Sequence, residues 1–341
     1  MKNFSAFPIL ALAVFMAGSA LAQAPIARPR IGTIDFYGLD KTKPEDLRKI
    51  LGVKEGDFLP RAKGDIEEEI EKLPNVVRAR LEAACCDDGK AVLYVGVEER
   101  GAPHFDYNPP PAGLAMLPRP VHDEYTQFLS ALGLAVRAGE TEEDLRQGHS
   151  LMANSGVRKH QERFQELAKE HLEALRDVLA HSADEEHRAI AAYVIGYAPR
   201  KVDVVKDLQA ALRDPDDTVR NNAARALAAI AVLATRLPEA EDPRDRLKVA
   251  PVWFVEMLDS LIWQDRMTGA ATLLTLTEKR NPAVIDLLRE RSMDTLREMA
   301  KWQHLAHALP AFILLGRVAG MTEEEIQAAW TAGDRSRVMA K

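Results

Sequence analysis

The sequence has few of the features that mark disulfide-stapled, nucleic-acid-binding or catalytic proteins. Its 341 residues include two cysteines, the neighbours Cys85 and Cys86, so a framework of several disulfide bonds is excluded. The formal net charge is −7, whereas nucleic-acid binding needs clustered Lys and Arg. A phosphate-cradling Gly-rich loop, a dinucleotide fingerprint and a Gly-x-Ser-x-Gly elbow are all missing. We therefore predict no catalytic residue, no cofactor, no metal and no nucleic-acid partner.

The two cysteines pose a separate question because they are adjacent. Neighbouring Cα atoms lie about 3.8 Å apart, below the usual range for a disulfide. We expect inert thiols at the end of a strand. A strained bridge between the neighbours and a disulfide to another chain are the alternatives.

Long hydrophobic runs are missing after the N-terminus, which itself has the form of a secretory signal. Lys2 precedes an apolar run at residues 6–18, and Ala20-Leu-Ala22 before Gln23 has the small-x-small form of a cleavage site. We predict removal of residues 1–22 and a periplasmic or secreted chain without a transmembrane segment. An uncleaved anchor is the alternative.

Residues 30–100 predict a small α+β domain with the order β-α-α-β-β. Apolar and polar residues alternate in the expected strands, and Pro44 and Gly52 delimit the first helix. The expected strands are residues 31–38, 77–83 and 91–97, and the expected helices are residues 42–51 and 65–73.

Four short motifs of this domain carry a family resemblance. They are Ile34-Asp-Phe-Tyr-Gly38, Leu51-Gly-Val-Lys-Glu-Gly56, Leu73-Pro-Asn-Val-Val77 and Val92-Leu-Tyr-Val-Gly-Val-Glu98. They resemble the signatures of polypeptide-transport-associated (POTRA) domains. The resemblance implies a periplasmic module that binds proteins, often by pairing a partner strand with a sheet edge. The strands of an outer-membrane barrel, which commonly follow such modules, are not seen after it.

Proline separates this domain from a helical remainder. Residues 101–120 hold six prolines, including Pro109-Pro-Pro111, and predict a semi-rigid linker that lies across a neighbouring surface. Residues 121–169 predict a helical N-terminal cap region, with one helix at 125–137 and another opened by Thr141.

A repeat marks the next helices, which we expect over residues 170–320. Arg188-Ala-Ile-Ala-Ala-Tyr-Val-Ile-Gly returns 32 positions later as Arg220-Asn-Asn-Ala-Ala-Arg-Ala-Leu-Ala, and each copy follows an acidic turn. Asp214-Pro-Asp-Asp-Thr-Val-Arg220 and Ala223-Ala-Arg-Ala-Leu227 resemble HEAT repeats. A third copy is expected around Arg266 and a degenerate fourth before Gly320, followed by a C-terminal helix and tail at 321–341. The fold class is thus multidomain, with the α+β domain followed by an all-α HEAT-like solenoid.

Small and charged residues of the repeat have a mechanical explanation. Alanines at matching positions let stacked helices approach closely. Arg188 and Arg220 are each expected to bond an aspartate of their own or the next acidic turn.

Helical arrays usually present surfaces to partners, so the sequence predicts a non-enzymatic scaffold that binds a protein or peptide. Position within the repeat suggests four contact residues, Tyr193, Asn221, Asn222 and Arg225. The sheet edge at residues 31–37 or 91–97 is the second expected contact. An alternative is that the α+β domain only packs on the helices and stabilises them.

Histidines offer the one alternative chemistry. His304 and His307 are three apart on a helix and could share a face for a metal, but nearby ligands do not complete a set. His149 and Ser150 are neighbours, which on a helix do not point at each other. A metal-binding protein, an enzyme using these histidines, or a relative of HEAT-like bilin lyases is therefore the alternative function.

Overall fold

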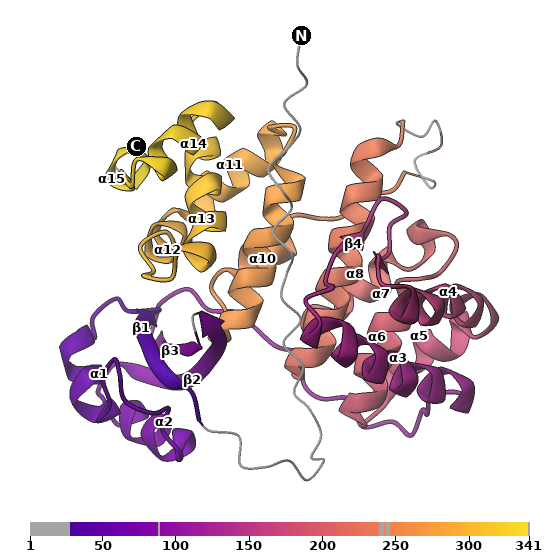
Figure 1. The fold of residues 1–341 in the computed structure, drawn as a ribbon, viewed down its shortest axis with the longest axis horizontal. Coiled ribbons are helices and arrows are strands. Elements are labelled where there is room, and N and C mark those ends of the chain that lie inside the picture. The colour runs from indigo at the N-terminus through magenta and orange to yellow at the C-terminus, as the bar shows by residue number, and fades with distance from the viewer. Residues whose placement is uncertain (1–27, 88, 239–241, 243–245, 340–341) are drawn as a thin grey trace. The chain divides into compact units, whose positions relative to one another are not determined.

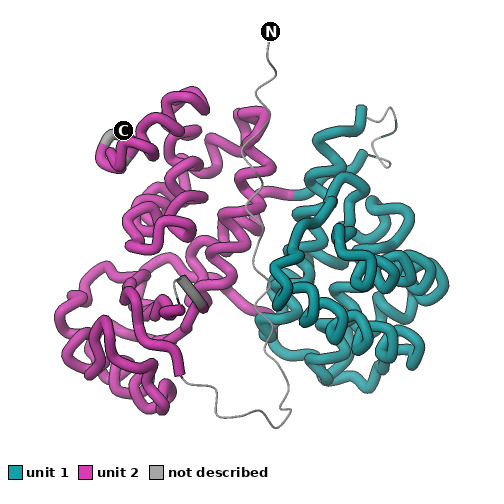
Figure 2. Tube along the Cα trace, in the orientation of Figure 1, with its two compact units in different colours: residues 1–24, 109–249 teal, residues 25–108, 250–341 magenta. Residues whose placement is uncertain are grey.

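The described chain divides into two compact units (Figure 2). The computed structural model describes residues 28–87, 89–238, 242 and 246–339, so the predicted signal segment at 1–22 lies outside the described residues. Unit 1 is the continuous stretch Pro109–Val249. Unit 2 combines the described residues up to Asn108 with those from Ala250 onwards. The predicted α+β domain thus shares a unit with the last helices of the chain, and the predicted array of residues 170–320 contributes to both units.

The front module, residues 30–100, has the predicted order of elements (Figure 1). These are β1 (Arg30–Tyr37), α1 (Pro44–Leu51), α2 (Lys63–Glu71), β2 (Val76–Asp87) and β3 (Lys90–Glu99). The strands form one sheet in the order β1-β3-β2, with β1 parallel and β2 antiparallel to β3. Strand β3 is therefore central, and β1 and β2 are the edges.

Local signals define helix α1 and the face it buries. Pro44 occupies the first turn, where its missing N–H removes no intrahelical bond. Gly52 ends the helix at φ 65°, a left-handed conformation that side chains with a Cβ rarely adopt. Leu47 and Leu51 of α1 and Ile70 of α2 then join the apolar side chains of one sheet face in a buried core.

The C-terminal part of unit 2 is helical. Its helices are α9 (Val252–Met257), α10 (Trp263–Leu276), α11 (Pro282–Arg291), α12 (Met293–Met299), α13 (Leu305–Val318), α14 (Glu323–Thr331) and α15 (Ser336–Met339). Thr322 and Glu325 form a capping box at the start of α14. No helix among the described residues has the length and apolar character needed to cross a membrane.

These helices cover the second face of the front sheet (Figure 1). Tyr94 of β3 stacks on Trp263 with ring centroids 4.9 Å apart, and Trp302 lies 5.1 Å from the same ring. The Tyr37 hydroxyl of β1 donates to the carbonyl of Leu261 at 2.7 Å. Tyr37 fits because Gly96 beside it has no side chain: a Cβ there would lie 2.5 Å from the tyrosine ring. The sheet is therefore buried between α1–α2 and the C-terminal helices.

The proline-rich linker lies against both units, as expected. In unit 2, the hydroxyl of Tyr107 is hydrogen-bonded to Ser260 Oγ at 2.9 Å. In unit 1, the N–H of Gly113 donates to His181 O, and the N–H of Ala183 donates to Gly113 O.

Unit 1 is helical apart from one small hairpin. It comprises α3 (Arg119–Arg137), β4 (Glu143–Asp144), β5 (Leu151–Met152), α4 (Ser155–Glu170), α5 (Leu172–His181), α6 (Glu185–Ile195), a 3-10 turn (Lys201–Asp203), α7 (Val205–Ala211) and α8 (Asp217–Arg236). The predicted helix after Thr141 is wrong, because the chain forms the hairpin there and the next helix is capped by Asn154. Asp184 and Asp216 cap α6 and α8 through their side chains, which accept from the N–H groups of His187 and Val219.

One hydrogen bond recurs in three helical repeats. Helices α6, α8 and α10 each begin three residues before an arginine, namely Arg188, Arg220 and Arg266. Each guanidinium donates to the carbonyl six residues earlier, on Ser182, Asp214 and Ser260 respectively. The third predicted repeat therefore shares the local geometry of the first two.

Candidate protein-binding surface

The predicted contact residues lie on helices α6 and α8, which pack against each other in unit 1. Tyr193 is half-buried among aromatic rings, including Phe128 at 5.0 Å and Tyr125 at 5.4 Å between centroids. Its hydroxyl lies 3.3 Å from the hydroxyl of Tyr197. Burial raises the pKa of Tyr193 and of Tyr197, so both phenols stay neutral hydrogen-bonding groups.

Arg225 of α8 lies beside this tyrosine cluster and is the charged residue within it. Its guanidinium lies 3.1 Å from Glu143 Oε2, and the two side chains are 17% and 19% exposed. Burial acts to lower the pKa of Arg225, but the charge of Glu143 and the neighbouring phenols raise it. The pair is thus a shielded ion pair between α8 and the hairpin.

The two asparagines have different surroundings. Asn222 is 6% exposed, and its Nδ2 donates to Ala189 O of α6 at 2.9 Å, so it serves the packing of the two helices. Asn221 is half-buried, and its Oδ1 is buried without a hydrogen-bond partner. Of the four predicted residues, Tyr193 and Arg225 lie in one cluster, and their binding to a partner remains a prediction.

Residues 141–153, which we call the strap, contact α4, α8 and the turn that follows α6. The Tyr197 hydroxyl donates to Ser150 O at 3.0 Å, and Gln161 Oε1 of α4 accepts from the N–H of Met152 at 2.7 Å. Ser150 Oγ donates to Glu143 Oε2 at 2.6 Å. The neighbours His149 and Ser150 thus face different partners, and sequence patterns gave no sign that this segment would lie on the helices.

The strap also buries a lysine without an acidic partner. Lys201 Nζ donates to Gly196 O at 2.8 Å and lies 3.0 Å from His149 Nδ1. Burial lowers the pKa of Lys201 to about 7. Burial, followed by the charge of Lys201, lowers the pKa of His149 to about 4. His149 Nε2 is buried without a hydrogen-bond partner.

A buried ion pair joins consecutive repeats of unit 1. The Arg188 guanidinium donates to both carboxylate oxygens of Asp214, at 2.8 and 3.0 Å. Arg188 is 2% exposed and Asp214 6%. The predicted bond to the aspartate of the next acidic turn is confirmed for Arg188. Arg220 donates to the carbonyls of Asp214 and Pro215.

The sheet edges of the front module differ from the prediction. Residues 91–97 are not an edge, because β3 pairs with β1 on one side and β2 on the other. On β1, Ile31 bonds residues 56 and 57, and Ile34 O accepts from Gln303 Nε2 at 2.9 Å. On β2, the N–H groups of Ala79 and Leu81 donate to carboxylates of α2. Much of both edges is therefore occupied within the chain.

The histidines of the last helices face the front sheet. His307 Nδ1 is hydrogen-bonded to the Tyr94 hydroxyl at 2.6 Å, and the His304 ring lies 3.9 Å from the His307 ring. Burial, with a smaller effect of His304, lowers the pKa of His307 to about 3. Within the described ranges, no group of three or more His, Cys, Asp or Glu is placed to hold a metal ion.

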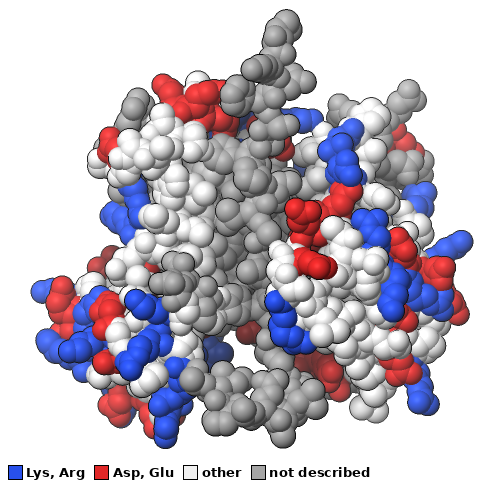
Figure 3. Space-filling model, viewed as in Figure 1, with Lys and Arg blue, Asp and Glu red and all other residues white. Residues whose placement is uncertain are grey.

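Two further features of unit 2 concern its surface. Lys and Arg are interleaved with Asp and Glu over the described front module on the face in Figure 3.

Cys85 is disulfide-bonded, in place of the inert thiol that we expected.

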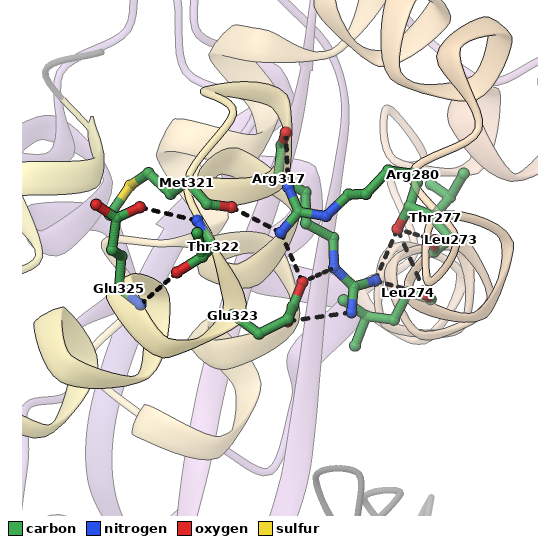
Figure 4. A network of polar contacts seen from close by, with 9 residues as sticks. All are labelled: Leu273, Leu274, Thr277, Arg280, Arg317, Met321, Thr322, Glu323 and Glu325. Atoms are coloured by element: carbon green, nitrogen blue, oxygen red, sulfur yellow. Dashed lines mark hydrogen bonds and ion pairs between the residues drawn. The ribbon is translucent and has the colours of Figure 1, made fainter. Parts of the chain in front are cut away.

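Arginines also fix the end of the helical part (Figure 4). Arg317 of α13 donates to Leu274 O at 2.6 Å and lies 3.0 Å from Glu323 of α14. Arg280 reaches the same carboxylate at 2.7 Å and the carbonyl of Met321 at 2.7 Å. These bonds tie the ends of α10 and α13 to the start of α14.

Comparison with known families supports one part of the chain. Residues 172–248 match the family of HEAT repeats. That match covers helices α5 to α8, which include the Arg188–Asp214 pair, Tyr193 and Arg225. No curated protein matches the chain. HEAT repeats suggest a helical scaffold for protein partners.

Proposed function

We propose that this protein is a non-enzymatic scaffold that binds a protein or peptide through the helical surface of unit 1. The similarity of residues 172–248 to HEAT repeats carries the proposal. HEAT-like arrays stack helix pairs so that one row of helices forms an extended surface. Here that surface includes Tyr193 of α6 and Asn221 and Arg225 of α8.

The packing of unit 1 supports a preformed surface. Arg188, Asp214 and Asn222 hold α6, α8 and the intervening turn in one arrangement through buried hydrogen bonds. A surface held in this way loses little conformational entropy when a partner binds. The helices can therefore recognise a partner without first folding around it.

The front module has a second proposed role, which is to stabilise the C-terminal helices. Trp263 and Trp302 pack on its sheet, and the Gly38 N–H donates to Glu298 of α12 at 2.8 Å. In a POTRA-like binding mode, the part of β2 beyond Leu81 is the edge we propose for pairing with an extended segment. We favour stabilisation because the β1 edge already contacts Gln303.

Export from the cytoplasm is the last part of the proposal. It rests on the signal-like residues 1–22, and it makes a periplasmic or secreted protein the expected partner. The alternative, a metal-binding protein or an enzyme using histidines, has less support because His307 bonds Tyr94 and His149 faces Lys201.

Site-specific photocrosslinking in the native envelope tests the scaffold proposal. A photoreactive residue at Ala228, on the same side of α8 as Asn221 and Arg225, should capture one or a few defined proteins. The same residue at Asp177, an exposed position of α5, is the control. Equal capture of abundant bystanders at both positions would contradict a dedicated binding surface.

A further inference from the structure

The strap contacts the helices of unit 1 in the way a bound peptide would. In its main chain, the carbonyl of Ser150 accepts from the Tyr197 hydroxyl, and the N–H of Met152 donates to Gln161 Oε1. Its Glu143 carboxylate forms an ion pair with Arg225 of α8. Extended peptides are commonly held by main-chain hydrogen bonds, with side-chain contacts giving specificity. The helices therefore present a receptor for an extended segment with one acidic side chain.

The strap is also held with unfavourable contacts. Among the described residues, His149 Nε2 is buried without a hydrogen-bond partner, and Lys201 beside it bonds the Gly196 carbonyl and an imidazole nitrogen of His149. Burying polar groups without full partners costs free energy, and opening the strap recovers it. A competing segment that lacks this histidine would avoid the cost.

We propose that Gln161, Tyr197 and Arg225 form a docking site for an acidic extended segment of a partner protein, which displaces the strap. The carboxylate of that segment replaces Glu143 on Arg225, and its main chain takes the bonds that Ser150 and Met152 now make. The inference rests on the proposed scaffold function and names the chemistry of its partner. The strap is the intramolecular competitor for the same site.

The chain geometry allows the strap to be removed cleanly. The N–H of Ala153 donates to Glu142 O at 2.8 Å, so the two ends of the strap are already paired. An Asn-Gly turn can therefore replace residues 143–152 without stretching the chain. The full-length protein with this replacement exposes the docking site and leaves every helix intact.

Binding of a labelled peptide with the sequence of residues 140–154 tests the site. The strapless chain should bind it saturably, and the unaltered chain at least tenfold more weakly. Arg225→Gln in the strapless chain, or Glu143→Gln in the peptide, should each weaken binding by about tenfold, the scale of a lost shielded ion pair. Combining the two changes should cause little further loss. Arg163→Gln, at an exposed position of α4, is the matched control.

A strapless chain that melts cooperatively but does not bind the peptide would overturn the proposal. Equal binding of the Glu143→Gln peptide would do the same. If the strapless chain does not fold, hydrogen exchange on the unaltered protein decides the question. The strap amides should then exchange through local opening, faster than those of α6, and exchange only with global unfolding would refute a displaceable strap.

The peptide and photocrosslinking experiments test the docking site and the scaffold function separately. Peptide binding without specific capture at Ala228 would keep the docking site and contradict the scaffold function. Specific capture with no peptide binding would keep the scaffold and reject this site.

Discussion

Removing the guanidinium of Arg188 should destabilise unit 1 strongly. Arg188 makes two bonds to Asp214 and a third to Ser182 O, all buried. Arg188→Ala leaves a carboxylate that is 6% exposed without its counter-charge and a carbonyl without its donor. Breaking a buried ion pair by removing one partner costs about 3–5 kcal/mol. For a unit of this size, that loss lowers the melting temperature by roughly 10 °C.

The positions of the tryptophans allow each unit to be followed separately. The chain has four, at 253, 263, 302 and 330, and all lie in unit 2. Tryptophan fluorescence therefore reports unit 2, while far-UV circular dichroism reports the helices of both units. Urea unfolding of Arg188→Ala should shift the dichroism transition towards lower urea and leave the fluorescence transition in place as an internal reference.

Two comparisons distinguish the buried pair from a general surface effect. Arg163→Ala removes an exposed arginine of α4 and should cost no more than about 0.5 kcal/mol. Adding Asp214→Asn to Arg188→Met should cost less than the sum of the single changes, because the uncompensated charge is then gone. A loss for Arg188→Ala that equals that of the exposed control would refute the reasoning.

Three further predictions concern unit 2 and the strap. Deleting residues 30–100 should lower the melting temperature of the remaining tryptophan-containing helices, because Trp263 and Trp302 lose the sheet face that covers them. An unchanged melting temperature by fluorescence would show that the front module does not stabilise these helices. Burial acts to raise the pKa of Glu323, but its bonds to Arg317 and Arg280 lower it below the ordinary value. The ionised carboxylate therefore stabilises unit 2 above its unfolded pKa, and this stabilisation is lost as pH falls through the folded pKa. Glu323→Gln should reduce the fall of the fluorescence melting temperature at acid pH. Burial with the strap closed lowers the pKa of Lys201 from 10.5 to about 7 and that of His149 from 6.5 to about 4. Because protonation then favours the open strap, closure should weaken as pH falls from 10.5 to 7 and again from 6.5 to 4. Hydrogen exchange of the strap, corrected for its intrinsic pH dependence, measures both phases, and Lys201→Met should remove the upper one.

The elements that the sequence predicted correctly depend on local signals. Pro44 and Gly52 bracket α1, because each acts through the conformation of its own backbone. The bond of Arg188 to an aspartate of the next turn could also be predicted, since the repeat fixes the distance between successive turns. Periodicity thus revealed both the helices and one contact between them.

The errors depend on contacts between residues far apart in the chain. Residues 91–97 were expected at an edge, but β3 is central because β1 pairs with it in parallel across two helices. Thr141 has the form of a helix cap, yet Glu143 bonds Arg225 of α8 and Ser150 bonds Tyr197, just after α6, and these bonds hold the segment as a hairpin. Such tertiary contacts override a local preference, and a single sequence does not reveal them.

At the end of the helical part, the carbonyl equivalent to those bonded by the repeat arginines also accepts a bond from an arginine. This arginine lies at a different position in the chain. Helix α13 has Ala308 three residues after its start, the position of Arg188 in α6. The carbonyl six residues before it, that of Trp302, instead accepts from Arg335 at 2.7 Å. Arg335 comes from the segment before α15, so the tail completes the last helical layer that lacks its own arginine.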